Sequence, residues 1–146
     1  MNSRPISIKE QIASMKRDWP GFRVGHLSRR DGAARWTGDL KQFQVHRIEI
    51  RYRVDYAPEV RVLSPALIRL PENPEGSLPH VYDRDDDPRL CLYDPSAGEW
   101  DATMHLARTI VPWSADWLAC YELWLMTGRW TGGGRHPTPR AAGVAS

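Results

Sequence analysis

The chain has 146 residues, of which 41% are hydrophobic and 26% are charged, a composition typical of an ordinary globular domain. Its formal net charge is only +2, which gives no argument for binding nucleic acid. The N-terminus lacks the apolar core of a signal peptide, and no apolar run reaches the ~18 residues of a membrane span. We therefore expect a soluble cytoplasmic protein with no direct nucleic-acid or membrane partner.

Charge is distributed unevenly along the chain. Residues 1–70 contain 14 Lys and Arg against 7 Asp and Glu, whereas residues 71–146 contain 6 against 11. Charged strand faces that are exposed to water explain such a bias in many proteins. A charged partner that orients on one half of the chain is the alternative.

Cys91 and Cys120 are the two cysteines of the chain. Two cysteines without a C-x-x-C pair predict neither a disulfide framework nor a zinc site, so we expect free thiols and no metal or cofactor. Cys91 lies between Leu90 and Leu92, where a cysteine is usually a small buried core residue. A thiol is also the strongest nucleophile among side chains at neutral pH, so chemistry at Cys91 is the competing interpretation.

An amphipathic helix is expected near the start of the chain. Ser7 and Glu10 have the spacing of a capping box, in which the two side chains satisfy backbone N–H groups reciprocally. Apolar residues then recur at helical spacing, at Ile8, Ile12, Met15 and Trp19. The outer face is basic, with Lys9, Lys16 and Arg17. Pro20 and Gly21 end the helix.

Four strands with short connections are expected next, over residues 22–27, 35–40, 47–56 and 60–63. The third has the clearest pattern, because apolar residues alternate with charged ones. These apolar residues are Ile48, Ile50, Tyr52, Val54 and Tyr56. Short connections between consecutive strands predict an antiparallel meander.

The segment 64–90 carries five prolines and shows no clear period. A loop of this length in a compact domain is usually functional or disordered. Its apolar stretches at 67–70 and 78–82 are unusual for disorder, so we expect packed irregular structure that presents Cys91.

Two C-terminal helices are expected after this segment. The first covers residues 104–111 and is ended by Pro112, and the second begins at the N-cap Ser114 and ends at Gly128. The second helix is apolar on more than one side, so it is buried or keeps one face for a partner. Cys120 lies in this helix and is expected in the core.

Five motifs stand in a characteristic order: Trp36-Thr37-Gly38, Tyr56-Ala57-Pro58-Glu59-Val60, Pro79-His80, Leu90-Cys91-Leu92 and Trp100. Together with the order of the expected elements, they resemble the ubiquitin-conjugating enzyme (UBC) fold. This is an α+β fold with an N-terminal helix, a four-stranded antiparallel meander, an irregular active-site segment and C-terminal helices. Residues 109–137 resemble a narrower group, the small bacterial UBC-like proteins encoded in anti-phage CBASS operons beside a cyclic-oligonucleotide synthase.

The resemblance implies a single UBC-like domain over residues 1–137 and a flexible C-terminal tail over 138–146. It implies that Cys91 is the catalytic nucleophile, which holds an activated carboxyl terminus as a thioester and passes the acyl group on. The implied partner is the C-terminus of the cyclic-oligonucleotide synthase (CD-NTase). The chain has no motif for binding a nucleotide with which to adenylate a carboxylate, so a charged donor or a separate activating enzyme is also implied.

The chain departs from the family at one position of the site. The family's Asn after His-Pro, which supports the oxyanion, is missing, and Val81-Tyr82 occupies that region. We expect the Tyr82 hydroxyl or a backbone N–H to donate the hydrogen bond instead. His80 is expected to be a structural hydrogen-bonding residue rather than a base. Asp94 and Asp101 either help to deprotonate an incoming amine or are solvated loop carboxylates.

Partner binding is expected on two surfaces. Aromatic side chains dominate binding hot spots, which favours Tyr93 and Trp100 near the thiol. Basic side chains suit electrostatic steering of a partner, and those expected to act are Lys9, Lys16 and Arg17 of the helix and Arg47, Arg51 and Arg53 of the third strand.

Two other functions remain open at this point. The missing Asn favours a non-catalytic UBC-fold adaptor that binds a partner's tail without covalent chemistry. A thiol hydrolase would need a base beside Cys91, for which His80, His105 and His136 are candidates. The acidic run Asp83, Asp85, Asp86 and Asp87 argues against the hydrolase, because nearby carboxylates raise the pKa of a thiol.

Overall fold

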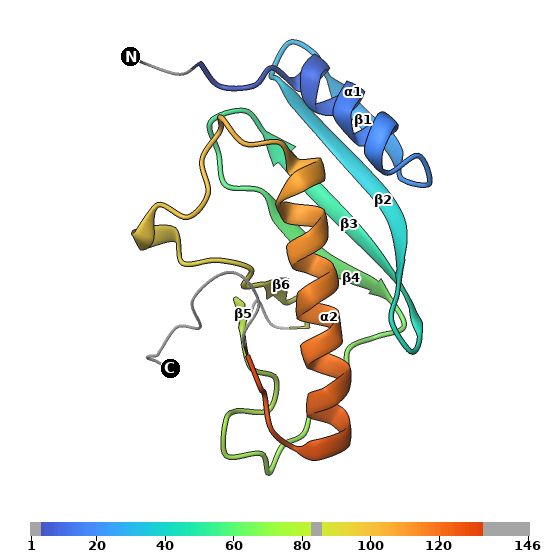
Figure 1. The fold of residues 1–146 in the computed structure, drawn as a ribbon, viewed down its shortest axis with the longest axis vertical. Helices are drawn as coiled ribbons and strands as arrows, with labels where there is room; N and C mark the ends of the chain where they lie inside the picture. Colours follow the sequence, from blue (N-terminus) through green and yellow to red (C-terminus); the bar gives the residue numbers. More distant parts are fainter. Residues whose placement is uncertain (1–3, 83–85, 133–146) are drawn as a thin grey trace.

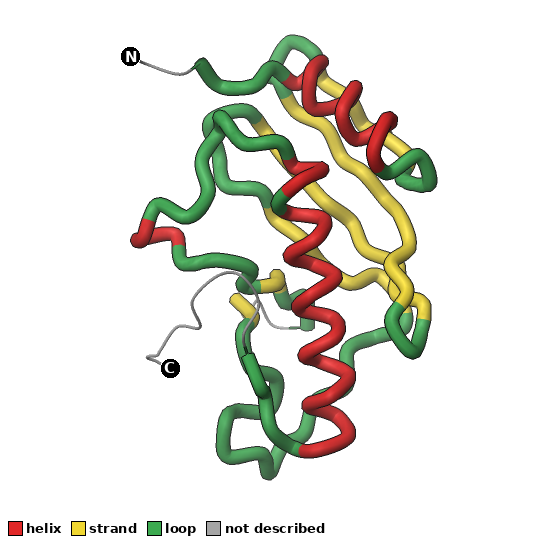
Figure 2. The backbone as a smooth tube through the Cα atoms, viewed as in Figure 1, coloured by secondary structure: helices red, strands yellow, loops and turns green. Residues whose placement is uncertain are grey.

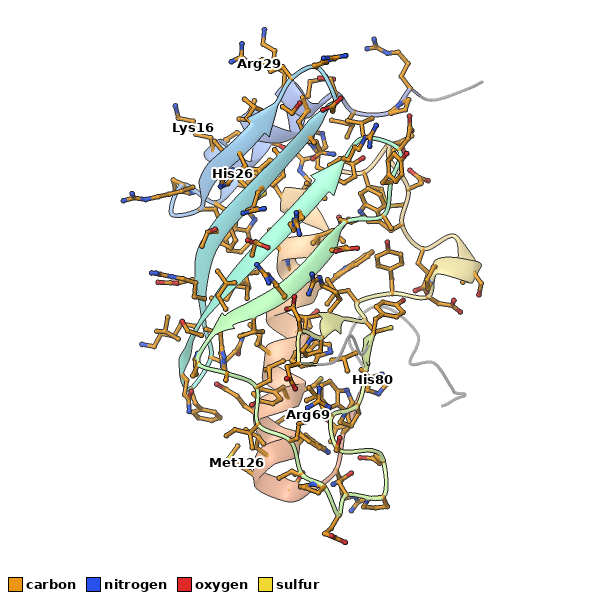
Figure 3. All side chains as sticks on the ribbon, turned by 180° about the vertical axis from the view of Figure 1, so that it is seen from behind. Lys16, His26, Arg29, Arg69, His80 and Met126 are labelled. Carbon is orange, nitrogen blue, oxygen red and sulfur yellow. The ribbon has the colours of Figure 1, made fainter. Side chains whose placement is uncertain are left out.

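The computed structural model describes residues 4–82 and 86–132. It is an α+β fold in which helices α1 and α2 cover the same face of a four-stranded sheet (Figure 1). Helix α1 spans Ile8–Asp18 and the long helix α2 spans Ile110–Thr127. Seen from behind, the other face of the sheet is open among the described residues (Figure 3). This architecture agrees with the UBC-like fold that the sequence predicts.

The sheet is an antiparallel meander in the order β1-β2-β3-β4, as predicted. Its strands are β1 Arg23–Ser28, β2 Ala33–Lys41, β3 Val45–Arg53 and β4 Glu59–Ser64. The alternation in β3 buries Ile48 and Ile50 completely against the helices. The expected third strand ran on to Tyr56 and is too long, because Asp55 takes a positive φ of 72° in the turn toward β4.

Close packing at Gly38 explains part of the Trp36-Thr37-Gly38 motif. The ring of Phe22 lies where a side-chain Cβ at position 38 would stand. Phe22 is buried in turn, edge-on to Trp19 with ring centroids 6.2 Å apart. Trp36 points into the same core and is 1% exposed. The glycine therefore lets an aromatic ring lie directly on the second strand.

Helix α1 has the predicted capping box, with Ser7 Oγ accepting from Glu10 N–H and Glu10 Oε1 accepting from Ser7 N–H, both at 3.1 Å. Its buried face is more polar than the apolar spacing suggests. Gln11 is fully buried and bonds both the carbonyl of Met104 and the N–H of Leu106, each at 3.0 Å. This amide therefore fixes α1 to the segment that leads into α2.

The C-terminal half corrects the sequence-based expectation of two helices. The expected helix over residues 104–111 is not formed, and a 3-10 turn, η2 Leu106–Arg108, takes its place. Helix α2 begins at Ile110 and contains Pro112 in its first turn, where a missing N–H costs no intrahelical bond. Ser114 is therefore inside the helix rather than its N-cap, and its Oγ donates to the carbonyl of Ile110 at 2.7 Å. Gly128 ends the helix as predicted, with φ at 74°.

The proline-rich segment is packed and irregular, as expected, but it ends in a short hairpin that the sequence did not indicate. The hairpin consists of β5 Val81–Tyr82 paired with β6 Arg89–Leu90 (Figure 2). Upstream of it, the N–H of Ile68 donates to the hydroxyl of Tyr121 at 2.7 Å. None of the described helices is long and apolar enough to cross a membrane.

A buried carboxylate fixes the turn between β2 and β3 to helix α2. Glu122 accepts hydrogen bonds from the N–H groups of Phe43 at 2.8 Å and Gln44 at 3.0 Å, and its Oε2 lies 2.9 Å from His46 Nε2. Burial alone would raise the pKa of Glu122. The hydrogen bonds from His46 and the two backbone groups outweigh that effect and lower the pKa.

Candidate functional site

Cys91 follows β6 directly, at the point where the short hairpin meets the rest of the domain. Its neighbours Leu90 and Leu92 are only 4% and 3% exposed, so they hold the backbone in the core. In extended backbone, successive side chains point to opposite sides. The side chain of Cys91 therefore points away from those of Leu90 and Leu92 and stays partly accessible. The sequence pattern is thus that of a thiol presented by two buried leucines, rather than of a fully buried core cysteine.

His80 fixes the backbone of the thiol from the opposite strand. Its carbonyl accepts the N–H of Cys91 at 2.9 Å and the indole N–H of Trp117, also at 2.9 Å. The residue has a positive φ of 58°, and its ring packs on Trp130 with centroids 5.0 Å apart. Trp117 and Trp130 therefore support His80, and the structural role expected of this residue stays a prediction.

Tyr82 lies beside the thiol. Its hydroxyl oxygen is 3.6 Å from Cys91 Sγ, within hydrogen-bonding distance for sulfur, and the carbonyl of Tyr93 is 3.7 Å from Sγ on another side. Burial, together with the hydrogen bond to Cys91, raises the pKa of the Tyr82 phenol far above its usual value. The phenol therefore keeps its proton at neutral pH and remains a hydrogen-bond donor.

The thiol itself is less acidic than a free cysteine. Burial raises the pKa of Cys91, the hydrogen bond between Sγ and the Tyr82 hydroxyl opposes this rise, and the charges of Asp94 and Glu99 add to it. The direction agrees with the sequence-based expectation, but the cause does not. Asp87 of the acidic run is paired with Arg61 and Arg89, while Asp83 and Asp85 lie outside the described residues.

The two candidate carboxylates are in different surroundings. Asp94 caps the short 3-10 turn η1 Pro95–Ala97, where it accepts from the N–H of Ser96 at 2.9 Å and from its hydroxyl at 2.7 Å. Its charge still acts on the thiol, as the pKa of Cys91 shows. Asp101 caps the turn that ends at Met104, next to the N-terminal segment, and its pKa is lowered by Thr103. Asp94 therefore acts on the thiol through its charge, whereas Asp101 lies in a separate turn.

The predicted partner-binding aromatics differ in accessibility. Trp100 packs edge-on to Tyr52, 5.6 Å between centroids, and donates its indole N–H to Thr109 at 3.0 Å, so it supports the site from inside. Tyr93 packs between Trp100 and Trp113 and lines a pocket beside the thiol. Only Tyr93 of this pair faces a surface that a ligand can enter.

The basic side chains of α1 are exposed, as predicted, but they are not part of the thiol site. Lys9, Lys16 and Arg17 lie on the outer face of a helix that packs at the β1 end of the sheet. The β5–β6 hairpin lies beyond the opposite edge, next to β4 (Figure 1). A partner that contacts α1 and Cys91 together must therefore span the sheet.

A pocket of about 240 Å³ lies beside the segment that carries Cys91, and we call it the thiol pocket. Cys91 is not among its lining residues, but Tyr82 and Tyr93, which both contact Sγ, are. Its walls are mostly apolar, which suits a peptide side chain or backbone segment. It is lined by Ala57, Pro58, Glu59, Tyr82, Arg89, Leu90, Leu92, Tyr93 and Pro95. The Tyr56-Ala57-Pro58-Glu59-Val60 motif therefore contributes one wall of the site.

A chain of ion pairs connects the β5–β6 hairpin to the sheet. Arg89, whose side chain is 8% exposed, lies 2.8 Å from Asp87 and 3.2 Å from Glu59 of β4. Arg61 of β4 bonds Asp87 at 3.1 Å and Glu49 of β3 at 2.9 Å. Sequence reasoning missed this network, because its members come together only when the hairpin folds back onto β4.

Within residues 4–82 and 86–132, no group of three or more His, Cys, Asp or Glu side chains could hold a metal ion. The two cysteines are free thiols. Cys120 is partly buried rather than fully in the core, with Sγ 3.3 Å from the carbonyl of Gly132.

The α+β architecture and a free thiol at the end of the hairpin define a UBC-like protein. Residues 11–137 match the family described as Type II CBASS E2 protein, and the chain belongs to this family. It is therefore an antiphage, E2-like protein that works with other CBASS components. A comparison with curated proteins gives no match.

Proposed function

We propose that this protein carries an acyl group as a thioester on Cys91, and that the group is the C-terminus of a cyclic-oligonucleotide synthase. The observation that carries the proposal is the position of Cys91. Its Sγ is partly accessible and lies 3.6 Å from the hydroxyl of Tyr82, a residue of the region where the family's Asn is missing. Tyr82 also lines the thiol pocket. The donor arrives already activated, by a separate enzyme of the same system.

The proposed step is a thioester exchange. Sγ of Cys91 attacks the carbonyl carbon of the activated terminus, a new C–S bond forms, and the bond to the leaving group breaks. The thiol proton leaves with the departing group. In the second half, a nucleophile on the acceptor attacks the same carbonyl, and Sγ departs and regains a proton.

Tyr82 is proposed to replace the missing Asn. A carbonyl bonded to Sγ places its oxygen close to the Tyr82 hydroxyl, which stays protonated because of its raised pKa. A protonated phenol can then donate to the oxyanion that forms during attack. Asp94 is proposed as the carboxylate that takes a proton from an incoming amine, since its charge already acts on the thiol.

The raised pKa of the thiol favours one alternative, the non-catalytic adaptor, because a neutral thiol attacks slowly. A thioester carrier tolerates such a thiol, since the activated donor supplies the driving force. A hydrolase is less well supported. Among the described residues, the hydrogen-bonding contacts of Cys91 Sγ are to Tyr82 and Tyr93, and none is to a histidine.

Co-purification tests the proposal. The protein is expressed with its operon neighbours, and its intact mass is measured before and after neutral hydroxylamine, which cleaves thioesters. A parallel sample contains a synthase that lacks its last few residues. We expect a hydroxylamine-sensitive adduct that disappears with the truncated synthase. An adduct that persists unchanged would identify a different donor, and absence of any adduct would favour the adaptor.

A further inference from the structure

We propose that the open face of the sheet beside the thiol pocket binds an acidic segment of the donor's tail, several residues before the carboxyl end that reaches Cys91. The inference rests on the proposed function and specifies the chemistry of the donor. It starts from a second hollow, of about 460 Å³, which we call the basic hollow. Its basic side chains are those of Arg35, Arg51 and Arg53, and His26 also lines it.

The basic hollow and the thiol pocket are neighbours, because Ala57 and Glu59 line both of them. A chain that leaves the thiol pocket over these two residues reaches the hollow. Figure 3 shows the open face of the sheet, with His26 on it. An extended peptide advances about 3.3 Å per residue, so a short tail is long enough to occupy both.

The sheet places like charges opposite each other in the hollow. Arg35 of β2 is the direct cross-strand partner of Arg51 of β3, and both side chains belong to the open face. On its other side Arg51 is opposite Glu59 of β4, whose carboxylate pairs with Arg89 at 3.2 Å. Like charges in this position destabilise a sheet, unless an anion lies between or above them. Arg53, two residues farther along β3, adds a third cation on the same face and packs over the ring of Tyr56 at 4.8 Å.

The carboxylates nearby are already engaged. Glu49 pairs with Arg61 at 2.9 Å and lies 3.4 Å from Arg35, and Glu59 pairs with Arg89 at 3.2 Å. No ion pair to Arg51 is found within the described residues, although Arg47 on the same strand and face pairs with Asp39 at 3.0 Å. The arginines of the hollow therefore concentrate positive charge at this end of the open face.

These features select an acidic peptide as the occupant. Guanidinium groups bind carboxylates through two parallel hydrogen bonds, so two or three exposed arginines suit a run of Asp or Glu. The peptide follows from the neighbouring thiol pocket, whose proposed occupant is the end of a polypeptide. The donor's tail should thus carry acidic residues upstream, an apolar residue at the thiol pocket, and its reactive carbonyl at Cys91.

Synthetic peptide thioesters test this without the natural donor. Three peptides of about ten residues share the same last residues and a small thiol leaving group, and differ upstream in being acidic, neutral or basic. Exchange forms the Cys91–acyl bond and releases the small thiol. We expect the acidic peptide to load about tenfold faster than the neutral one at low salt, with the advantage lost at high salt.

The decisive variant is Arg51→Glu combined with Arg53→Glu, which should reverse the order so that the basic peptide loads fastest. Arg47→Glu is the matched control, because Arg47 lies on the same strand and face outside the hollow. The contact expected of Arg47 is with the body of the partner, which the peptides lack, so this variant should leave the order unchanged. If the double variant does not fold, the milder Arg51→Gln replaces it. It removes the Arg35–Arg51 repulsion, so it should raise the melting temperature by about 2 °C while reducing the acidic preference.

The outcomes separate the two proposals. If every peptide loads Cys91 at the same rate, the carrier function stands and the binding of an acidic segment in the basic hollow is refuted. If no peptide loads, the carrier function itself fails. An equal response to Arg47→Glu would show that only overall charge matters. If a short oligonucleotide binds in the hollow and acidic peptides load no faster than neutral ones, the hollow is assigned to nucleic acid and the inference is overturned.

Discussion

Replacement of Tyr82 by Phe tests the role given to its hydroxyl. The ring stays, so the packing beside Cys91 is retained, and only the oxygen 3.6 Å from Sγ is lost. A single oxyanion donor in a dry site is worth about 10²–10³ in rate. Tyr82 is 44% exposed, so water can partly replace the phenol, and we expect a decrease of about 10- to 100-fold in thioester formation.

The assay is exchange between the protein and a peptide thioester, followed by mass as a function of pH. The lost hydrogen bond also lowered the pKa of Cys91, so the Phe variant should need a higher pH to reach its maximal rate. Tyr93→Phe is the matched control, because its backbone carbonyl, rather than its hydroxyl, contacts Sγ. An unchanged rate and pH profile for Tyr82→Phe would refute the assignment.

Three further predictions concern reactivity and stability. Because burial raises its pKa, Cys91 should react slowly with iodoacetamide at neutral pH, and the rate should keep rising above pH ~8.5; an inflection below pH 7 would contradict this. Glu122 has a lowered folded-state pKa, so its stabilising effect is present above the usual carboxyl pKa and is lost as pH falls through the folded value. Glu122→Gln should therefore flatten the loss of stability in acid melts, and an unaltered acid profile would argue against it. Gly38→Ala should destabilise the fold by about 1–3 kcal/mol, because the new Cβ meets the Phe22 ring. Denaturant titration measures this loss, and Gly25→Ala, where the space around the new Cβ is open, is the control. An equal loss of stability in the two variants would disprove the packing argument.

Local patterns in the sequence predicted the regular elements well. The Ser7–Glu10 capping box and the alternation of β3 depend on neighbouring residues, and the structure has both. Pro112 was misinterpreted because a proline that ends one helix and a proline in the first turn of the next look alike in sequence. Strands of two residues, such as β5 and β6, are too short to show a period.

The site was predicted only in part, for a different physical reason. The position of Cys91 between two leucines is local, whereas its surroundings depend on contacts between distant segments. The carbonyl of His80 accepts hydrogen bonds both from Cys91 and from Trp117, which lies 37 residues away in sequence. Likewise Arg89 is held by a carboxylate of β4, 30 residues away in sequence. Such contacts leave no spacing signal in a single sequence.

Trapping of the acyl group on a serine tests the central claim most directly. Cys91→Ser should convert the thioester into an oxyester, so the adduct with the synthase terminus should persist in neutral hydroxylamine and map to position 91 by peptide mass. Cys120→Ser is the control, and its adduct should remain hydroxylamine-sensitive at Cys91. An adduct that stays sensitive in Cys91→Ser, or that disappears only in Cys120→Ser, would contradict the assignment of Cys91 as the carrier.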